Sequence, residues 1–443
     1  MRVAVIGAGP TGLVTGIGLA RRGHQVSVID RDPGPAADGS WPRRGVMQFH
    51  HAHAFRGQVH EVLEQEAPEV LDAWLASGAE PVPLTMPDGR EVVMAVLSRR
   101  QTFETALRAT AATQEGLTIT RGHVDAVVAE AGQATGVVMD GTAVAADLVI
   151  DASGRSSRVT RDLPRSPFLG GPCGIAYVDR VYRLHDGAGR GPMSSPLAWR
   201  ANFDGYQVIL FVHERGFFSV LLIRNTDDAA LKALRVEAAF EATCRAIPGL
   251  ADWVDPERSS PVTSVLPGGM LLNHYKGQRG PDGRLVLPGL VFVGDAVCTT
   301  TPNFGRGVTT SLQQVRELLR LVDEHGADLV STGESFDGWC ETHMRPWVED
   351  HIHIDEQQRR RWAGEDVDLT QRLPSDLVLA AAEVDEEIGA GIFPYTSMLG
   401  GPDSLDAVEP RARAMYADGW RPDPAPGPTR QELVEIIRSS VPT

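Results

Sequence analysis

Three glycines near the N-terminus have the spacing of a phosphate-binding turn. Gly7, Gly9 and Gly12 form the pattern G-x-G-x-x-G directly after the apolar run of residues 3–6. The first glycine lets the chain turn, the second lets the backbone approach a pyrophosphate, and the third lets a helix pack close to a strand. The pyrophosphate would lie at the N-terminus of that helix, where free N–H groups and the helix dipole favour an anion.

An acidic residue completes this pattern. Asp30 lies 18 residues after Gly12, at the end of a second apolar run formed by residues 26–29. A carboxylate at this place can hold a ribose diol, and it repels a 2′-phosphate. Because strand, helix and acid fall in register, residues 1–33 predict the first half of a dinucleotide-binding βαβ unit. This motif alone does not distinguish NAD from FAD.

A second group of candidate residues lies nearly three hundred positions along the chain. The apolar run of residues 290–293 ends in Gly294 and Asp295, and a P-x-x-G-x-G spacing follows in residues 302–307. With the N-terminal motif, this segment resembles the FAD-dependent monooxygenases of the aromatic-hydroxylase and squalene-epoxidase superfamily, whose core the flavin-dependent halogenases share. The resemblance covers most of residues 1–325.

The resemblance assigns roles to this second segment. It implies that Asp295 binds the ribityl chain of FAD and that the backbone amides of residues 305–309 pass the isoalloxazine ring. Physical chemistry supports the second role, because a glycine-rich helix entry offers free N–H groups and a positive dipole end to a negatively charged reduced flavin.

Two further stretches match the same superfamily. Arg100 resembles the arginine that opens a helix beside the FAD diphosphate, where a guanidinium can pair with two phosphate oxygens. Residues 43–48, together with His51 and His53, resemble a segment of the epoxidase-like branch that lies along the flavin. The cofactor-binding candidates are Gly7, Gly9, Pro10, Thr11, Gly12, Asp30, Arg31, Arg44, Gln48, Arg100, Val124, Asp151, Gly154, Gly294, Asp295, Pro302, Gly305 and Gly307, with the backbone of Gly305, Gly307, Val308 and Thr309 at the isoalloxazine.

The implied chemistry is carried mainly by the cofactor. Reduced FAD reacts with O2, and the resulting C4a-hydroperoxyflavin hydroxylates or epoxidises a substrate, while the protein supplies orientation and a dry cavity. No catalytic side chain is assigned, because no Ser/His/Asp set or carboxylate pair stands out. An enzyme of this kind fits secondary-metabolite biosynthesis.

The source of electrons depends on residues 151–158. If Gly154 takes the place of the family's glycine, Ser153 replaces an aspartate that is associated with FAD and NAD(P)H. We therefore hypothesise that NAD(P)H is the ultimate donor and that a separate flavin reductase delivers the reduced flavin. Direct reduction by NAD(P)H is the alternative.

An aromatic-rich stretch between the two flavin segments predicts the substrate wall. Residues 174–225 are rich in Val, Ile, Phe and Tyr with hairpin turns, which indicates an antiparallel sheet. Together its aromatic residues favour an apolar or aromatic substrate. Tyr177, Tyr206 and His213 are candidate hydrogen-bonding groups, and the predicted wall residues are Trp199, Phe203, Tyr206, Phe211, Phe217 and Phe218.

The histidines do not predict a metal site. His50, His51 and His53 have no acidic or thiol partner at a useful spacing, so no metal is expected. His351 and His353 are expected as a surface pair on a helix.

These elements predict an α/β protein with a discontinuous, Rossmann-like FAD-binding domain. That domain comprises residues 1–170 and 276–325, and a β-rich substrate domain of residues 171–275 is inserted in it. Residues 326–443 form a helical C-terminal region that carries no recognised motif.

Bulk composition excludes several classes of partner. The 443 residues carry a net charge of −16, which argues against nucleic acid or an anionic membrane surface, since both attract basic faces. No apolar run approaches the length of a membrane span. The four cysteines form no C-x-x-C pair, and the N-terminal apolar run leads into the glycine motif instead of a signal cleavage site. The protein is therefore expected to be cytoplasmic and reduced.

Three alternatives remain. A flavin dehydrogenase or reductase uses the same fold. A halogenase also does, but the W-x-W-x-I-P motif of those enzymes is missing and no lysine precedes Lys232. A non-catalytic escort protein on a relic flavin fold would tend to lose the flavin motifs, which are intact here.

Overall fold

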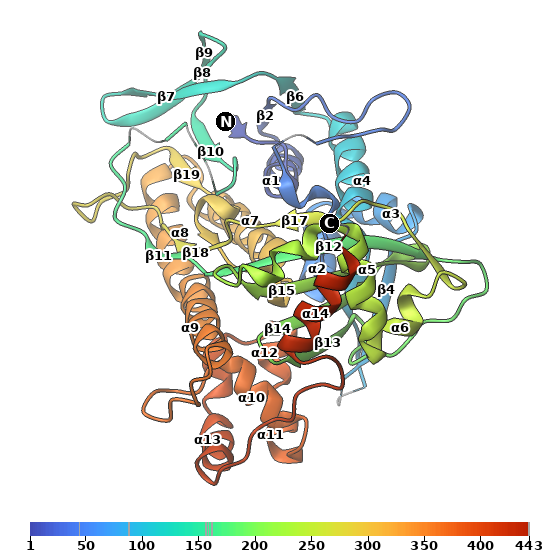
Figure 1. The fold of residues 1–443 in the computed structure, drawn as a ribbon. Coiled ribbons are helices and arrows are strands. Elements are labelled where there is room, and N and C mark those ends of the chain that lie inside the picture. Colours follow the sequence, from blue (N-terminus) through green and yellow to red (C-terminus); the bar gives the residue numbers. More distant parts are fainter. Residues whose placement is uncertain (44, 87–88, 156, 158, 161–162, 442–443) are drawn as a thin grey trace.

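A five-stranded parallel sheet forms the centre of the computed structural model, which describes residues 1–443 apart from 44, 87–88, 156, 158, 161–162 and 442–443. Its strand order is β19-β10-β1-β2-β6 (Figure 1). Strands buried on both faces need near-continuous apolar sequence, which these segments have. The strands are β1 (Arg2–Ile6), β2 (Gln25–Asp30), β6 (Leu117–Arg121), β10 (Leu148–Asp151) and β19 (Leu290–Phe292).

Two helices that follow the glycine motifs pack against each other beside this sheet. α1 (Pro10–Arg21) begins directly after the first motif, and α7 (Gly307–His325) begins directly after the second. They approach closely at Gly18, where a Cβ would meet the Leu319 side chain. The expected α/β fold class, with its parallel sheet assembled from distant segments, is confirmed.

A larger antiparallel sheet lies below the parallel one. Its order is β13-β14-β15-β12-β16, and β17 also pairs with β12. Side chains alternate between two buried faces, since the period of a strand is two. The strands are β12 (Ile175–Leu184), β13 (Ala198–Phe203), β14 (Tyr206–Val212), β15 (Phe217–Asn225), β16 (Ser259–Pro261) and β17 (Leu266–Gly268).

The two faces of the antiparallel sheet have different neighbours. One face carries Tyr177, Ile209, Phe211 and Leu221 and belongs to the cluster that includes Ala54. The opposite face packs on helices α5 (Glu237–Ala246), α6 (Pro248–Val254) and the final helix α14 (Arg430–Ser440), in a core that includes Phe203, Tyr206 and Phe218.

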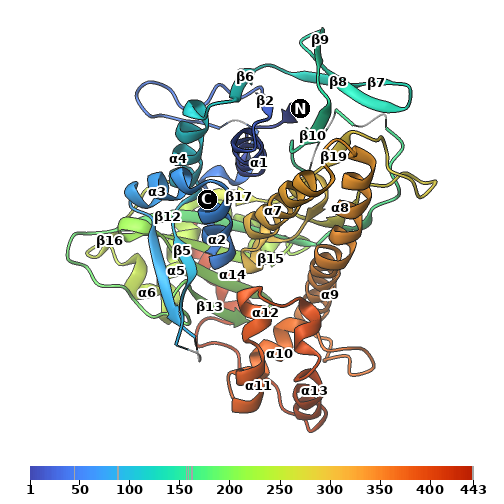
Figure 2. The same cartoon turned by 180° about the vertical axis from the view of Figure 1, so that it is seen from behind.

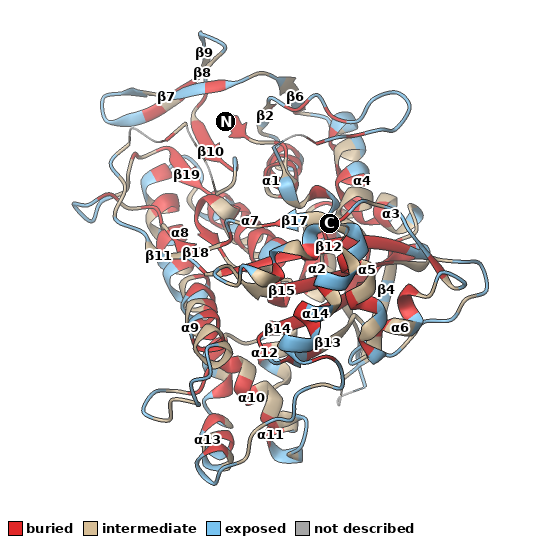
Figure 3. Ribbon diagram, viewed as in Figure 1, coloured by how far each residue is buried: buried red, intermediate tan, exposed pale blue. Residues whose placement is uncertain are grey.

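The remaining helices form a layer at the far end of the molecule, where α9 extends from the sheets to the others (Figure 2). They have a small apolar core of their own around Tyr395 and Leu405. Buried segments concentrate in the two central sheets and in α7, whereas the helices of this layer are exposed on their outer sides (Figure 3). The helices of this layer are α9 (Arg345–Trp362), α10 (Ser375–Ala382), α11 (Glu386–Gly391), α12 (Phe393–Ser397) and α13 (Glu409–Ala417), whereas α8 (Leu329–His343) packs beside α7 in the central core.

Three small sheets and three helices complete the fold. The sheets have the orders β3-β5-β4, β7-β8-β9 and β11-β18-β20. In the described part of the chain, no helix has the length and apolar character that a membrane crossing requires. These elements are β3 (Phe55–Arg56), α2 (Gly57–Glu66), α3 (Pro68–Ala76), β4 (Glu80–Thr85), β5 (Glu91–Leu97), α4 (Arg100–Thr113), β7 (Val124–Glu130), β8 (Gln133–Met139), β9 (Thr142–Ala145), β11 (Leu169–Pro172), β18 (Leu272–Tyr275) and β20 (Cys298–Thr299).

Candidate functional site

A cavity of about 340 Å³ lies where the two glycine motifs meet the antiparallel sheet. Its wall is formed by the first glycine turn, by residues 43, 45–48 and 52–54, by the entry to α7 and by one face of the antiparallel sheet. Most of the predicted site residues lie together on this wall. They are Gly7, Gly9, Pro10, Thr11, Asp30, Gln48, Arg100, Gly154, Asp295, Pro302, Gly305, Gly307 and Val308.

The first turn needs its glycines for packing. Gly7 has φ +104°, and a Cβ there would lie 2.7 Å from the Ala152 carbonyl oxygen. A Cβ on Gly12 would overlap the Gly7 carbonyl oxygen, so the helix could not approach the turn. Asp30 fixes the turn from the next strand, because its Oδ2 accepts a hydrogen bond from Ala8 N at 2.6 Å. The turn is therefore preorganised in the form that the spacing predicts.

The two motifs touch. Gly294 has φ +69°, and a Cβ there would lie 2.7 Å from Thr11 Oγ1 on the first turn of α1. Its N–H donates to Gln314 Oε1 on α7 at 2.8 Å, which ties the end of β19 to that helix. Segments nearly three hundred residues apart thus form one continuous wall.

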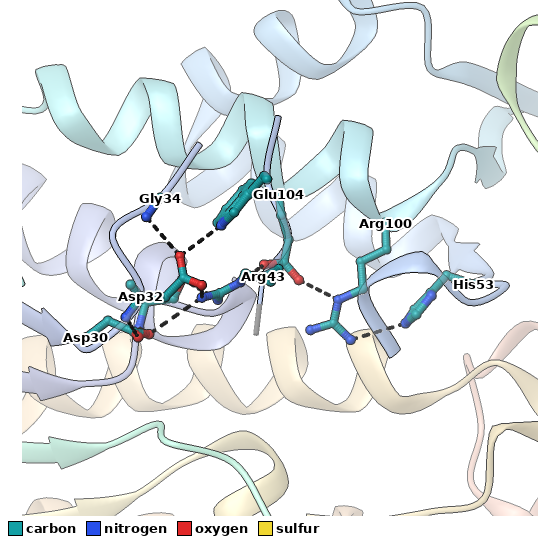
Figure 4. A network of polar contacts seen from close by, with 9 residues as sticks. Asp30, Asp32, Gly34, Arg43, His53, Arg100 and Glu104 are labelled. Carbon is teal, nitrogen blue, oxygen red and sulfur yellow. Dashed lines mark hydrogen bonds and ion pairs between the residues drawn. The ribbon is translucent and has the colours of Figure 1, made fainter. Parts of the chain in front are cut away.

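A buried arginine links the turn to helix α4. Arg43 is 3% exposed, and its Nη1 lies 3.8 Å from Asp30 and 3.6 Å from Asp32. Its Nε contacts Glu104 at 3.1 Å, and its Nη2 donates to the Ala8 carbonyl at 3.0 Å. Figure 4 shows this network. Arg44, a predicted cofactor-binding residue, lies outside the described residues, and its neighbour Arg43 is not among the predicted cofactor-binding residues.

Arg100 and His53 continue the same network toward the cavity (Figure 4). Arg100, the first residue of α4, donates to Glu104 and, through Nη1, to His53 Nε2 at 3.2 Å. His53 Nδ1 donates to the His51 carbonyl at 2.9 Å, so this imidazole is neutral. Burial, followed by the charge of Arg100, holds the pKa of His53 well below its usual value. Glu104 thus lies between the two guanidinium groups, and Arg100, which lines the cavity, is placed where a guanidinium could pair with a phosphate.

The entry to α7 is open toward the cavity. Gly305 adopts φ +62° and packs on Ala54. Gly307 begins the helix, and no atom lies within 4 Å of the position that a Cβ would take. Asp295 lies on the same wall, and burial raises the pKa of its carboxyl.

These residues fit FAD. Gly9, Gly154 and Gly307 all line the cavity and leave unfilled the space that side chains would take. The first residues of α1 and of α7 both lie on this wall, and the N–H groups of a first helical turn have no partner within their own helix. In the described residues, no group of three or more His, Cys, Asp or Glu side chains has a geometry that could hold a metal ion.

Six predicted residues lie away from the cavity wall. Gly12 packs under the turn, and Gly294 packs on Thr11. Asp151 is fully buried and accepts hydrogen bonds from Ser153 N and Oγ at 3.0 and 2.6 Å, so it positions the turn after β10. The other three are Arg31, which is exposed, Val124, which is in the core, and Thr309, which is buried on α7.

Of the six aromatic residues predicted to line the substrate wall, only Phe211 reaches the cavity. Phe203, Tyr206 and Phe218 are on the opposite face, because strand alternation directs them toward α5 and α14. Trp199 packs with that second core, and Phe217 stacks on Arg99. Of the candidate hydrogen-bonding groups, Tyr206 donates to the Pro428 carbonyl and His213 bonds to Ser219. Further wall residues lie outside the predicted set: Ala52, Ala54, Ala152, Arg155, Leu221, Leu271, Leu272, Thr299, Thr300 and Ser311.

Tyr177 is the candidate hydrogen-bonding group that does line the cavity. Its ring lies perpendicular to that of His51, with ring centres 5.3 Å apart. Burial, and then the charge of Asp179, raise the pKa of its hydroxyl, so this phenol stays protonated.

The expectation that His351 and His353 form a surface pair is wrong for His351, which is completely buried. Its Nδ1 contacts Thr301 Oγ1 at 2.9 Å and its Nε2 accepts from Arg306 Nη1 at 3.1 Å. Arg306, in the loop before α7, also lies 4.3 Å from the centre of the Trp347 ring. Helical periodicity predicted α9 but could not show that this face meets the α7 entry.

Comparison with known proteins agrees with this architecture. A sequence model described as FAD dependent oxidoreductase matches residues 2–98, and one described as tryptophan halogenase matches residues 75–165. The D-amino acid dehydrogenases of Sinorhizobium medicae and Rhizobium johnstonii are 47% and 45% identical over 49 residues. Each match covers 11% of this chain and 12% of the relative.

Similar solved structures cover far more of the chain. The flavin-dependent brominase Bmp2 superposes with a TM-score of 0.58 at 15% identity, over 99% of this chain and 98% of that one. PqsL, a probable FAD-dependent monooxygenase from Pseudomonas aeruginosa, gives 0.59 at 15% identity over 82% and 98%. CtdE in complex with FAD gives 0.56 at 14% identity over 81% and 93%. The chain has the fold of the FAD-dependent monooxygenase superfamily. The resemblance inferred from the motifs is confirmed at this level.

Proposed function

We propose that this protein is an FAD-dependent monooxygenase that hydroxylates or epoxidises an apolar or aromatic small molecule. The observation that carries the proposal is a single cavity shared by both glycine motifs, where Gly294 packs on Thr11. The same cavity continues to Tyr177, Phe211 and Leu221. A dinucleotide site that opens onto an apolar pocket is the arrangement that oxygen transfer to an apolar substrate requires.

Each end of the cavity would hold a different part of FAD. The N-terminus of α1 and the Arg100 guanidinium would bind the diphosphate, Asp30 the ribose and Asp295 the ribityl hydroxyls. Backbone amides at Gly305 and Gly307 would stabilise negative charge on the reduced ring. When bound, FAD would supply the oxygen-transfer chemistry.

The protein's own side chains would orient the substrate and exclude water. Phe211, Leu221 and Leu271 provide an apolar surface. The Tyr177 phenol, kept protonated by its surroundings, would donate a hydrogen bond to a substrate oxygen.

Reduced flavin would come from a separate reductase that uses NAD(P)H. The support is Ser153, which stands where direct users of NAD(P)H carry an aspartate and whose hydroxyl is engaged with Asp151 at 2.6 Å. Stopped-flow mixing of the FAD-loaded protein with NADPH should therefore give no fast, substrate-stimulated bleaching of the flavin. Rapid bleaching by NADPH alone would contradict the need for a separate flavin reductase.

The decisive assay combines the protein with FAD, a flavin reductase, NADH and candidate substrates, with and without O2. A monooxygenase gives a product heavier by one oxygen atom only when O2 is present. A dehydrogenase gives an oxidised product that contains no oxygen from O2. An escort protein binds its cargo and gives no product under either condition.

Halogenation is the second candidate, because Bmp2 superposes over nearly the whole chain. Adding bromide or chloride to the same assay separates the two reactions, since a halogenated product would replace the oxygenated one. Against this candidate, neither lysine of the chain, Lys232 or Lys276, is on the cavity wall in the described residues.

A further inference from the structure

Three arginines meet around one aromatic ring beside the cavity. The guanidinium carbons of Arg200 and Arg306 lie 4.6 and 4.7 Å from the centre of the Phe304 ring. Arg56 Nη2 donates to the Phe304 carbonyl oxygen at 2.7 Å. Three cations therefore share a small volume, and one of them, Arg306, lines the cavity.

Counter-charge for this cluster is incomplete. Asp350 lies 3.3 Å from Arg306 and also accepts from Tyr395 and Ser375. Among the described residues, neither Arg56 nor Arg200 has a carboxylate within ion-pair distance. Asp376 and Glu383 act on Arg200 only at longer range, and Asp376 already pairs with Arg361. The cluster thus holds more positive than negative charge, an unfavourable arrangement unless an anion completes it.

Burial makes this imbalance costly. It lowers the pKa of Arg56 to about 9, with a further contribution from Arg306, and it also lowers the pKa of Arg200. Both side chains nevertheless keep intermediate exposure. Side chains deep in a fold that still retain accessible surface can be reached by a ligand.

Strand register places Arg200 on the cavity side of the antiparallel sheet. It pairs with Ile209 on β14, which in turn pairs with Leu221 on β15. Directly paired residues share a face, and Leu221 lines the cavity. Two strand spacings separate Arg200 from Leu221, which is about 10 Å.

Arg200 also has a free donor group. With the Gln207 amide oxygen facing it, Nε and Nη2 of Arg200 donate at 3.1 and 3.2 Å. Within the described residues, no partner is found for its Nη1. A guanidinium held on one edge with the other edge free is suited to a carboxylate.

We propose that Arg200 binds an anionic group of the substrate, namely a carboxylate, at the end of the cavity opposite the glycine turn. Arg56 and Arg306 add to the positive potential there, and the apolar body of the substrate lies against Phe211 and Leu221. This rests on the proposed function and narrows it to substrates that carry both an apolar part and a carboxylate.

A matched pair of probes tests this assignment. We would titrate 2-naphthoate and 2-naphthamide, which differ in charge but share the ring, into the FAD-loaded protein by calorimetry. The proteins are the wild type, Arg200→Gln, Arg200→Lys and, as a control, Arg235→Gln, whose arginine is exposed. Thermal unfolding and FAD content are recorded for each variant. If a variant keeps its FAD content but loses its preference for naphthoate, the anion site has been lost and the flavin site has not.

The wild type and Arg235→Gln should bind naphthoate roughly ten- to a hundred-fold more tightly than naphthamide, the range of a charged hydrogen bond. Arg200→Gln should lose this preference, and Arg200→Lys should keep part of it because its charge remains. Arg200→Gln should not lower the melting temperature, since it removes a partly buried charge that has no carboxylate partner.

Equal binding of the two probes to the wild type, no binding of naphthoate, or an undiminished preference in Arg200→Gln would overturn the proposal. So would displacement of naphthoate by millimolar chloride well beyond that by sodium sulfate of the same ionic strength. That result would indicate that Arg200 binds a free halide ion and not a substrate carboxylate.

Discussion

At the glycine-turn end of the cavity the chain offers backbone groups, and at the opposite end it offers side chains that are partly or fully buried. The turn is built from residues 7–12 and Asp30, close in sequence and fixed by local sterics. At the opposite end, Arg56 and Arg306 contact helices of the C-terminal region, and Arg200 packs on the Phe304 ring. Backbone sites demand particular residue types at fixed spacings, whereas side-chain sites demand only that distant segments meet. The first kind of site can therefore be recognised in a sequence and the second cannot.

The largest effect should come from filling the turn. Gly12→Val would drive a side chain into the Gly7 carbonyl, so we expect loss of FAD binding together with misfolding. Gly338→Ala on α8 is the control, because no atom lies within 4 Å of its Cβ position. Expression, melting temperature and FAD absorbance measure both variants. A Gly12→Val protein that binds FAD normally would contradict the geometry of the turn.

The next largest effect is a loss of stability expected from substitutions around Arg306, at the opposite end of the cavity. Asp350→Asn leaves Arg306 without its counter-charge in a buried site and should cost about 3–5 kcal/mol. Tyr395→Phe removes only the 2.7 Å hydrogen bond to Asp350 and should cost about 1 kcal/mol. Denaturant unfolding measures both. If the two variants lost the same free energy of unfolding, the charge of Asp350 would contribute nothing to stability beyond its hydrogen bond to Tyr395.

The stability of the protein should depend on pH through Asp355, a buried residue of α9. Burial raises the pKa of this carboxyl to about 7 against the hydrogen bonds that it accepts. The native state therefore keeps the proton up to about pH 7, whereas the unfolded chain releases it near its ordinary value. Wild-type stability thus falls as pH rises between these two pKa values.

Asp355→Asn should remove this loss. Relative to the wild type, the variant should gain up to about 3 kcal/mol between pH 4 and pH 7 and then level off. Buried histidines such as His213 and His274 titrate in both proteins and cancel in the difference. A difference that does not vary with pH would show that Asp355 is ionised throughout.

A smaller effect is expected at the glycine-turn end. Arg100→Gln should weaken FAD binding about tenfold, because one charge-assisted contact with the diphosphate is lost. Arg345→Gln, in an exposed pair on α9, should leave FAD affinity unchanged. If both variants bind FAD like the wild type, Arg100 serves only to hold His53 and Glu104.

The contrast between the two ends explains what the sequence could predict. Gly7, Gly9, Asp30, Asp295 and the α7 entry were identified because their spacing is set by local geometry. The residues of the substrate wall could be predicted only in part. Strand alternation divides the side chains between two faces of the sheet, but it does not show which face meets the cavity. Only Phe211 of the predicted aromatic residues therefore lines it.

Tertiary contacts account for the remaining residues. Arg43 stands in an Arg-Arg pair, and sequence alone does not say that its side chain turns inward. His351 is buried through contacts with Thr301 and Arg306, which lie at least 45 residues away in the chain. Such residues carry no local pattern of their own.

The most direct test of the account is an FAD titration of Gly307→Val beside the wild type. The added side chain would project into the cavity without meeting protein atoms, so the fold should remain intact. We predict one FAD per wild-type chain, and for Gly307→Val an unchanged melting temperature without FAD but affinity at least about tenfold weaker. A wild-type protein that binds no FAD, or a Gly307→Val protein that binds it equally well, would contradict a shared flavin site.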